Sequence, residues 1–313
     1  MKRSMQWAVW GVVAATSLAL STPLKAQNNG ANSEPMKNTG PGAWQHGKTL
    51  GHLERARKLI GQEVVSSDSQ RVGKLNDFAV DLNSGRILYA IVGTGGFLGA
   101  GEHLVAVPPE MFTQPEANNI QLKVDKQKFS SAPEVTREME RSEAMGQSSF
   151  LTQVYQFYGQ TPHWLSSGTE GKTFNAALRV NYLLGTKIEN ASNTTIGKLY
   201  DFALDLAPGR AVFVALSPES GTGLGDNLYA VPPSLLTWNA DQKVLTTDIT
   251  NEKLQAAPHF AKDDWSNLSN PSFAAQVYQY YGKQPFFQTG GIQESTTPSL
   301  RPTGRTKENQ QQP

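Results

Sequence analysis

Two pairs of aspartates are the residues whose type and spacing could most readily do chemistry in this 313-residue chain. Asp77 and Asp81 lie four positions apart, and Asp201 and Asp205 repeat that spacing. Paired carboxylates can bind calcium or serve as general acid and base. The alternation of apolar and polar residues, however, places each pair on the outward face of a strand, opposite residues such as Phe78. We therefore interpret the pairs as solvated groups, with Asp81 also placed to cap the following turn, and predict no metal site.

The histidines and serines form no recognisable catalytic or metal-binding motif. A zinc-binding helix needs two histidines three or four positions apart, and a hydrolase serine sits in a Gly-x-Ser-x-Gly elbow; neither pattern occurs. The absence of cysteine excludes disulfides, thiol catalysis and cysteine-ligated zinc. The five histidines are His46, His52, His103, His163 and His259. We predict a non-enzymatic chain with no catalytic residue, no cofactor and no metal.

A glycine-rich stretch at residues 93–101 could in principle hold a phosphate. It does not fit the dinucleotide-binding fingerprint, because the sixth position counted from Gly93 is Leu98. It does not fit the P-loop either, since Gly101 is followed by Glu102, whose carboxylate would repel a phosphate. Two interpretations stay open. Leu98 and the phenylalanine before it plug one end of a barrel, or they stand exposed and anchor a partner.

An internal duplication organises the chain. Residues 72–82 read VGKLNDFAVDL and residues 196–206 read IGKLYDFALDL, with identity at eight of eleven positions and an offset of 124. The paired prolines at 108–109 recur at 232–233 with the same offset. A later segment, FLTQVYQFYGQTP from Phe150, recurs as FAAQVYQYYGKQP at an offset of 123. We interpret these matches as two copies of one structural unit.

Each copy is predicted to be mainly β. Residues 77–82 alternate in polarity like a half-buried strand, and residues 83–85 supply turn-forming side chains. An apolar run at 87–92 then completes a hairpin. A shorter strand at 104–107 ends at the paired prolines, which cannot donate to a sheet. Short strands punctuated by 28 glycines and 18 prolines favour a small antiparallel barrel in each copy.

An amphipathic helix is predicted after each barrel. Phe150, Val154, Phe157 and Tyr158 recur at helical spacing before Gly159, and the second copy repeats the pattern. Such a stripe usually faces the core. Tyr155 and its counterpart fall on the outward side, where they could pack the two units together or contact a partner. The candidate partner-binding residues are therefore Gly96, Phe97, Leu98, Gly99, Gly101, Glu102, Tyr155 and Tyr278.

The N-terminus is typical of a secretory signal peptide. Lys2 and Arg3 precede an apolar run at 7–20 that is short for a membrane span, and Ala26 offers a small residue for cleavage. We predict export to the periplasm with cleavage near Ala26; retention of this segment as a membrane anchor is the alternative. After cleavage, 25 basic residues would face 27 acidic ones, and this nearly neutral charge argues against nucleic-acid binding.

The sequence resembles the PRC-barrel family over about residues 55–133 and 179–258. The motifs that carry the resemblance are IGQEV at 60–64, VGKL at 72–75, the turn at 81–85, Val107-Pro108 and the stretch at 92–102. The resemblance implies an antiparallel β-barrel used for protein contact and assembly, as in the H subunit of the photosynthetic reaction centre. It implies no enzymatic activity that the family shares.

Fold class and function follow from these patterns. We predict a mainly β chain of two PRC-type barrels in tandem, each followed by an amphipathic helix, with disordered termini. The segments are a signal peptide (1–26), a flexible linker (27–49), barrel 1 (50–133), a helical connector (134–172), barrel 2 (173–258), a helical segment (259–285) and a disordered tail (286–313). We expect a non-enzymatic periplasmic interaction or assembly module whose partner is another protein. The alternatives are a small-molecule or lipid carrier that binds between the copies, and a membrane-anchored barrel protein.

Overall fold

The computed structural model describes residues 50–95, 103–113, 119–140, 143–162, 164–165, 174, 177–221, 223–266 and 270–287. The expected signal peptide, the whole of the linker and most of the tail lie outside the described residues. So do six of the eight candidate contact residues, namely Gly96, Phe97, Leu98, Gly99, Gly101 and Glu102. What the sequence predicts for these segments stays a prediction. Within the described residues, no helix is both long and apolar enough to cross a bilayer.

We call the described residues 50–165 the N-terminal half and the described residues 174–287 the C-terminal half. The N-terminal half contains β1 (Leu53–Arg55), α1 (Ala56–Leu59), β2 (Glu63–Val65), β3 (Arg71–Asp81), β4 (Arg86–Thr94), β5 (His103–Val107), η1 (Pro109–Met111), β6 (Asn119–Gln121), α2 (Lys126–Phe129), α3 (Arg137–Glu140), η2 (Glu143–Gly146) and α4 (Ser148–Phe157).

The C-terminal half presents a closely similar order of elements. It contains β7 (Ala177–Arg179), α5 (Val180–Leu183), β8 (Lys187–Asn190), β9 (Thr195–Asp205), β10 (Arg210–Pro218), β11 (Leu228–Val231), η3 (Pro233–Leu235), β12 (Thr237–Asn239), β13 (Val244–Thr247), α6 (Asn251–Gln255), β14 (His259–Phe260) and α7 (Pro271–Tyr280).

The predicted hairpin is present in both halves. β3 pairs antiparallel with β4, and β9 pairs antiparallel with β10. Each turn contains a glycine with positive φ, Gly85 at 62° and Gly209 at 63°, a backbone conformation that costs glycine little. Both hairpins are interrupted by register shifts, such as the one between Leu75 and Asp77. These shifts break the strict alternation of faces on which the sequence reading relied.

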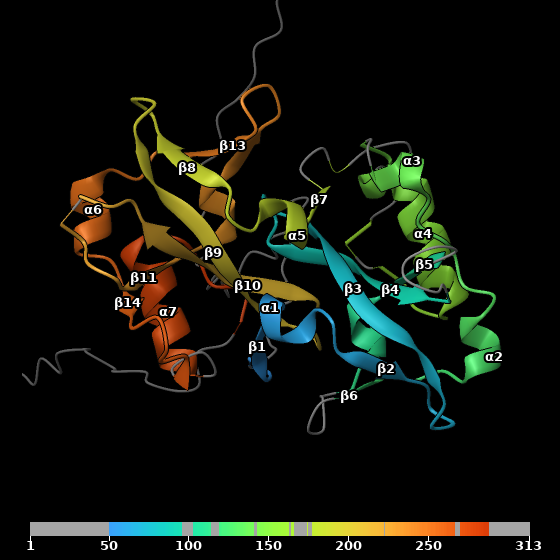
Figure 1. The fold of residues 1–313 in the computed structure, drawn as a ribbon. Coiled ribbons are helices and arrows are strands. Elements are labelled where there is room, and N and C mark those ends of the chain that lie inside the picture. Colours follow the sequence, from blue (N-terminus) through green and yellow to red (C-terminus); the bar gives the residue numbers. More distant parts are fainter. Residues whose placement is uncertain are drawn as a thin grey trace, which may run out of the picture. The chain divides into compact units, whose positions relative to one another are not determined.

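Strands from both halves belong to one sheet of 14 strands (Figure 1). β1 pairs with β9 of the C-terminal half, and β7 pairs with β3 of the N-terminal half. β4 and β10 also meet, at Arg86 and Arg210. The mainly β fold with a curled sheet is therefore confirmed. The expectation of two sheets that each close on themselves is corrected, because each half lends its first strand to the other.

The sequence predicted purely antiparallel strands, but the sheet also contains two parallel pairs. β2 pairs in parallel with β6, and β8 pairs in parallel with β13. In both halves a strand that follows the paired prolines and their 3₁₀ turn, β6 or β13, returns beside the short strand that precedes the hairpin and runs in the same direction as it. All other strand pairs among the described residues are antiparallel.

The ten-residue helices α4 and α7 bury Val154 and Val277 of the predicted stripes, but the buried face extends further around each helix than the sequence suggested. Tyr155 and Tyr278, expected to point outward, are only 2% and 6% exposed. The Tyr155 hydroxyl donates to the Leu88 carbonyl at 3.1 Å, and the Tyr278 hydroxyl donates to the Val212 carbonyl at 2.8 Å. A tyrosine can be buried when its hydroxyl finds such an acceptor. These two residues therefore anchor the helices on the sheet and present no outward contact surface.

Candidate functional site

The exchanged strands bring a buried carboxylate beside an arginine of the other half at two places. Arg55 at the end of β1 pairs with Asp201 on β9, with 3.1 Å between Nε and Oδ2. Arg179 at the end of β7 pairs with Asp77 on β3, with 2.7 Å between Nε and Oδ2. The two arginines differ by 124 in number, and so do the two aspartates. We call these contacts the Asp201 junction and the Asp77 junction.

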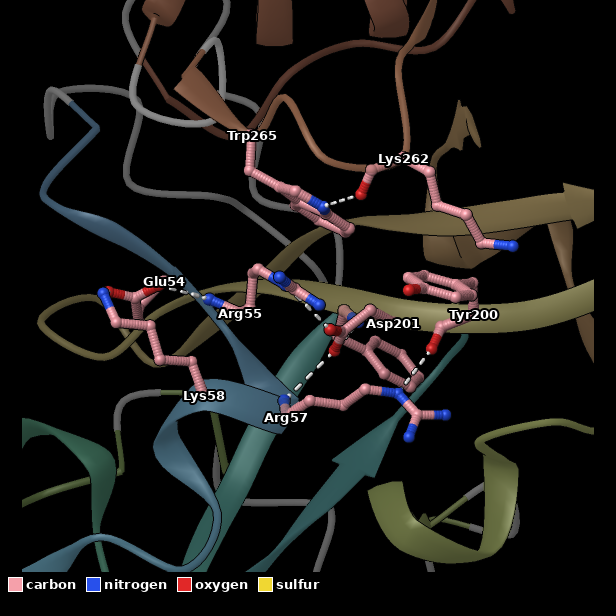
Figure 2. A network of polar contacts seen from close by, with 9 residues as sticks. Glu54, Arg55, Arg57, Lys58, Tyr200, Asp201, Lys262 and Trp265 are labelled. Atoms are coloured by element: carbon pink, nitrogen blue, oxygen red, sulfur yellow. Dashed lines mark hydrogen bonds and ion pairs between the residues drawn. The ribbon is translucent and has the colours of Figure 1, made fainter. Parts of the chain in front are cut away.

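The Asp201 junction is shown in Figure 2. One carboxylate oxygen, Oδ1, accepts from the backbone N–H of Phe202 at 2.9 Å and from that of Arg57 at 3.2 Å. The other oxygen accepts from Arg55. The guanidinium of Arg57 turns away and donates from Nε to the Tyr200 carbonyl at 2.9 Å. A residue of α1 and a residue of β1 therefore both hold the same carboxylate of the other half.

The Asp77 junction repeats the inner contacts with different outer residues. Oδ1 of Asp77 accepts from the backbone N–H of Phe78 at 2.8 Å and from that of Asn181 at 3.1 Å. Arg179 also donates from Nη2 to Oδ1 of Asn76 at 2.7 Å. The backbone and ionic contacts to the carboxylate are thus the same at both junctions, which places the two halves in a reciprocal arrangement.

Burial governs the electrostatics of both carboxylates. Neither aspartate side chain is exposed, whereas Arg55 and Arg179 are 29% and 23% exposed. Desolvation raises the pKa of Asp77, against the opposing influence of Arg179 and the backbone N–H groups. Desolvation likewise raises the pKa of Asp201, opposed by its backbone donors and by Arg55. Two acids held at a strand junction by hydrogen bonds are structural groups.

The prediction that these acidic pairs lie on a solvated face is therefore wrong. Asp77, Asp81, Asp201 and Asp205 are all buried, because segments of the other half cover this part of the sheet. The turn-capping prediction for Asp81 is confirmed, since its carboxylate accepts from the backbone N–H of Ser84 at 3.0 Å. Asp205 instead accepts from the backbone N–H of Gly51, in the other half, at 2.6 Å.

Two arginines face each other where β4 and β10 meet. Arg86 and Arg210 are direct partners across the antiparallel strands. Burial lowers the pKa of Arg86 to about 10 and that of Arg210 to about 9, the latter also through repulsion from Arg86. Glu110 and Asp81 oppose both shifts. Burial and mutual repulsion therefore act against the two positive charges, and nearby carboxylates partly offset this.

The outer surfaces of the two junctions differ. At the Asp201 junction the Arg55 guanidinium lies 4.4 Å from the centre of the Trp265 ring, and Trp265 stacks on Tyr200 at 6.3 Å. Lys262 and Arg57 lie 5.2 and 5.7 Å from the centre of the Tyr200 ring (Figure 2). We call Arg57, Tyr200, Lys262 and Trp265 the cation–aromatic patch.

At the Asp77 junction, two of the equivalent positions carry different residues. Asn76 stands where the other junction has Tyr200, and Asn181 stands where it has Arg57. The Asn181 side chain donates to the Asn76 carbonyl at 3.1 Å. Since both junctions form with the same inner contacts, these inner contacts do not depend on Tyr200 or Arg57.

The described residues offer little for catalysis. They contain no group of three or more histidine, aspartate or glutamate side chains that could hold a metal. Exposed His103 lies 3.2 Å from Glu134, and Nδ1 of His259 lies 2.9 Å from the Ala257 carbonyl, just before β14. The sequence reading missed the arginines of both junctions. Their recurrence at the offset of the duplicated aspartates was the signal that could have identified them.

Comparison with known proteins identifies one domain. Residues 51–128 match the model of the PRC-barrel domain family. No curated protein matches the chain. The match covers the N-terminal half up to α2, including the strand that is lent to β9 and the hairpin that receives β7.

Proposed function

We propose that this chain, whose residues 51–128 contain a PRC-barrel domain, is an exported protein-interaction and assembly module built from two PRC-type barrel units. Each unit is completed by the first strand of the other, which explains why the sheet is shared. PRC-barrel domains are not a known enzymatic family. A non-enzymatic role therefore agrees with the domain that the chain contains.

The proposal rests on a comparison of the two junctions. Their contacts to the buried carboxylate are the same, but their outer residues differ. Their shared contacts hold the halves in one arrangement, and the same contacts form whether the outer residues are Tyr200 and Arg57 or Asn76 and Asn181. Tyr200 and Arg57 are thus not required for the inner contacts, although Tyr200 and Trp265 also pack against the core. The exposed groups of the patch are better candidates for recognition than fully buried residues.

The composition of the patch suits binding to another protein. Tyrosine, tryptophan and arginine are the residue types most enriched at binding hot spots. Tyr200 and Trp265 are half-buried and held by stacking, while Arg57 and Lys262 are exposed. A partner would therefore meet aromatic rings that lose little conformational freedom on binding. The loop residues Gly96 to Glu102 remain a second proposed contact, outside the described residues.

Variants copied from the other junction provide a direct test. Tyr200→Asn and Arg57→Asn install the residues that the Asp77 junction already tolerates, so both should fold normally. Tagged wild-type protein and the double variant would be cross-linked in a periplasmic extract and their bound proteins identified by mass spectrometry. We expect a partner that the double variant loses while its melting temperature stays within a few degrees of the wild type.

Asn76→Ala at the other junction is the matched control and should keep the partner. Phe97→Ala tests the loop in the same assay, with the same requirement that the melting temperature is retained. If the double variant and Phe97→Ala both keep every wild-type partner, neither proposed surface mediates recognition and the proposal fails.

Export is a separate part of the proposal. Cleavage near Ala26 predicts a mature protein that begins close to Gln27. N-terminal sequencing of the protein from the periplasm tests this, and an intact Met1 in a membrane fraction would support the anchored alternative instead.

The alternative function, a carrier, would hold its ligand between the two halves, and the structure does not support this. Among the described residues, the region where the halves meet is occupied by paired strands and by the two ion pairs. An interaction module is therefore the function that the geometry supports best.

A further inference from the structure

Two lysines lie directly opposite each other on the C-terminal half. Lys187 of β8 and Lys198 of β9 are Cα partners in the antiparallel ladder, and both side chains are exposed. Directly opposite residues share one face of a sheet, and like charges placed in this way destabilise it. Neither lysine forms an ion pair with a carboxylate of the described residues. We call Lys187 and Lys198 the lysine pair, and strand pairing gains nothing from it.

The N-terminal half has opposite charges at the equivalent positions. Glu63 and Lys74, each 124 positions earlier, are Cα partners of β2 and β3. Glu63 also pairs with Arg71, with 3.2 Å between Oε2 and Nε. The same ladder thus forms with attracting charges, so the fold does not require a lysine at position 187. A local conflict of this kind is expected at functional sites.

The lysine pair lies on the outer face of β9 that also carries Tyr200. Lys198 and Tyr200 stand on either side of Leu199, which is fully buried. Successive side chains of a strand point to opposite faces, and Lys198 is accordingly exposed and Tyr200 half-buried. Lys187 lies across from Lys198 on β8. The lysine pair and the Tyr200 ring therefore belong to one surface.

Two further cations flank the Tyr200 ring. Lys262 Nζ lies 5.2 Å and Arg57 Cζ lies 5.7 Å from the centre of this ring. Figure 2 shows both charged ends reaching past Tyr200 on the side away from Asp201. Because Lys198 precedes Tyr200 and Asp201 follows it, the lysine pair lies on that same side along β9. We call the following residues the basic stripe: Arg57, Lys187, Lys198, Tyr200 and Lys262.

The cations of the basic stripe are not neutralised by direct contacts. Three acids, Glu189, Asp263 and Asp264, lie within two positions of its residues in sequence. Asp264 accepts from the backbone N–H of Ser266 at 3.0 Å and from its hydroxyl at 2.5 Å. Within the described part of the chain, none of the four cations forms an ion pair. Such a surface is complementary to a partner that presents carboxylates.

This inference rests on the proposed function and names the chemistry of the partner. We propose that the basic stripe binds an extended peptide segment of the partner with acidic residues at alternate positions. Alternate residues of a strand lie about 6.6 Å apart, which is the spacing of Lys198 and Tyr200 along β9 and also that of alternate carboxylates in an extended peptide. One carboxylate would meet the lysine pair and the next would meet the cations beside Tyr200.

A lipid surface fits the basic stripe less well than a peptide does. Proteins that lie on a membrane insert exposed apolar side chains between the lipids. Among the described residues the only large hydrophobic side chain that is exposed is Tyr182, which is not part of the stripe. The rings of the patch are half-buried and cannot be inserted in this way.

Calorimetry with the full chain and two synthetic peptides of about nine residues tests the proposal. In one peptide glutamate alternates with alanine, and in the other glutamine replaces glutamate. We expect saturable binding of the glutamate peptide, with Kd on the order of 0.1 mM at low salt, and binding at least about tenfold weaker for the glutamine peptide. The affinity for the glutamate peptide should fall as salt is raised, because exposed charges are screened.

Lys187→Glu separates binding from stability. It installs the residue of the N-terminal half opposite Lys198, so repulsion becomes attraction and the variant should melt at the same or a higher temperature. It should bind the glutamate peptide about tenfold or more weakly. Lys126→Glu, at an exposed lysine of α2 in the N-terminal half, makes the same change in net charge and should bind like the wild type.

Three results overturn the proposal: no saturable binding of the glutamate peptide up to about 10 mM, equal binding of the glutamine peptide, or unchanged affinity in Lys187→Glu. Binding to vesicles of phosphatidylcholine and phosphatidylserine in place of the peptide, lost in Lys187→Glu, overturns the peptide in favour of a membrane. The proposed function is tested apart from this. If Tyr200→Asn/Arg57→Asn loses a partner in the extract while the glutamate peptide does not bind, the interaction module stands and the acidic segment is wrong.

Discussion

Removing the arginine from one buried ion pair tests the account of the junctions most directly. In Arg179→Met the apolar stem is kept, but the charge 2.7 Å from Asp77 is lost. The Asp77 carboxylate is then left buried, with the backbone N–H groups of Phe78 and Asn181 as donors. Breaking a buried pair from one side costs roughly 3–5 kcal/mol. Because two hydrogen bonds to the carboxylate survive, we expect the lower end, about 3 kcal/mol at about pH 8.

The unfolding free energy lost in Arg179→Met should be smaller at acidic pH. Burial already raises the pKa of Asp77, and losing Arg179 raises it further, since the cation favours the charged form. A carboxyl whose pKa is higher in the folded than in the unfolded state stabilises the fold most below its unfolded pKa. That contribution is lost as the pH rises through the folded pKa. Protonated Asp77 needs no cation, so the free-energy loss in Arg179→Met should be clearly smaller at about pH 5 than at about pH 8.

Urea unfolding of wild type and variant at the two pH values measures this free-energy loss. Arg71→Met is the control, because its pair with Glu63 at 3.2 Å is exposed and should contribute less than about 1 kcal/mol. The double variant Asp77→Asn/Arg179→Met should recover most of the stability, since no buried charge remains. A loss below about 1 kcal/mol at about pH 8, or the same loss at both pH values, would refute the reasoning.

Two further outcomes are expected from packing at single sites. A Cβ on Gly73 would lie 2.2 Å from the Gly93 carbonyl oxygen, so Gly73→Ala should destabilise the fold by more than about 3 kcal/mol. The measurement is the melting temperature, which should fall strongly. An unchanged melting temperature would show that the strands separate easily. Tyr278→Phe removes the donor to the Val212 carbonyl and should cost about 1–2 kcal/mol in urea unfolding. Tyr182→Phe, at an exposed ring, should change stability by less than about 0.5 kcal/mol, and an equal cost for both would contradict the burial of Tyr278.

Patterns that are local in sequence predicted the strands and hairpins well. The duplicated stretch at 72–82 and 196–206 becomes the long strands β3 and β9, and the turn residues after each form the glycine-containing turns. The paired prolines directly follow β5 and β11. These features depend on neighbouring residues alone, because turn chemistry and the missing proline N–H act within a few positions.

The helices show where local periodicity stops being sufficient. Leu151, Val154 and Tyr155 are buried on α4, and Tyr158 is buried just after its end. Val154 belongs to the predicted stripe, and spacing alone does not show how far around the helix the buried face extends. Burial of Tyr155 depends on the Leu88 carbonyl, which lies in a strand distant in sequence and accepts from the Tyr155 hydroxyl.

By itself, the sequence determined that the chain is mainly β, that two stretches recur at a fixed offset, and that residues 51–128 form a PRC-barrel domain. Only the tertiary structure decided that Asp77 and Asp201 are buried and that each is held by an arginine more than a hundred positions away. Alternating polarity predicts which residues share a face of a strand, but it does not predict what packs against that face. Whether an aspartate meets water or an arginine depends on a strand that arrives from elsewhere in the chain, and that information lies in the pairing of the two halves.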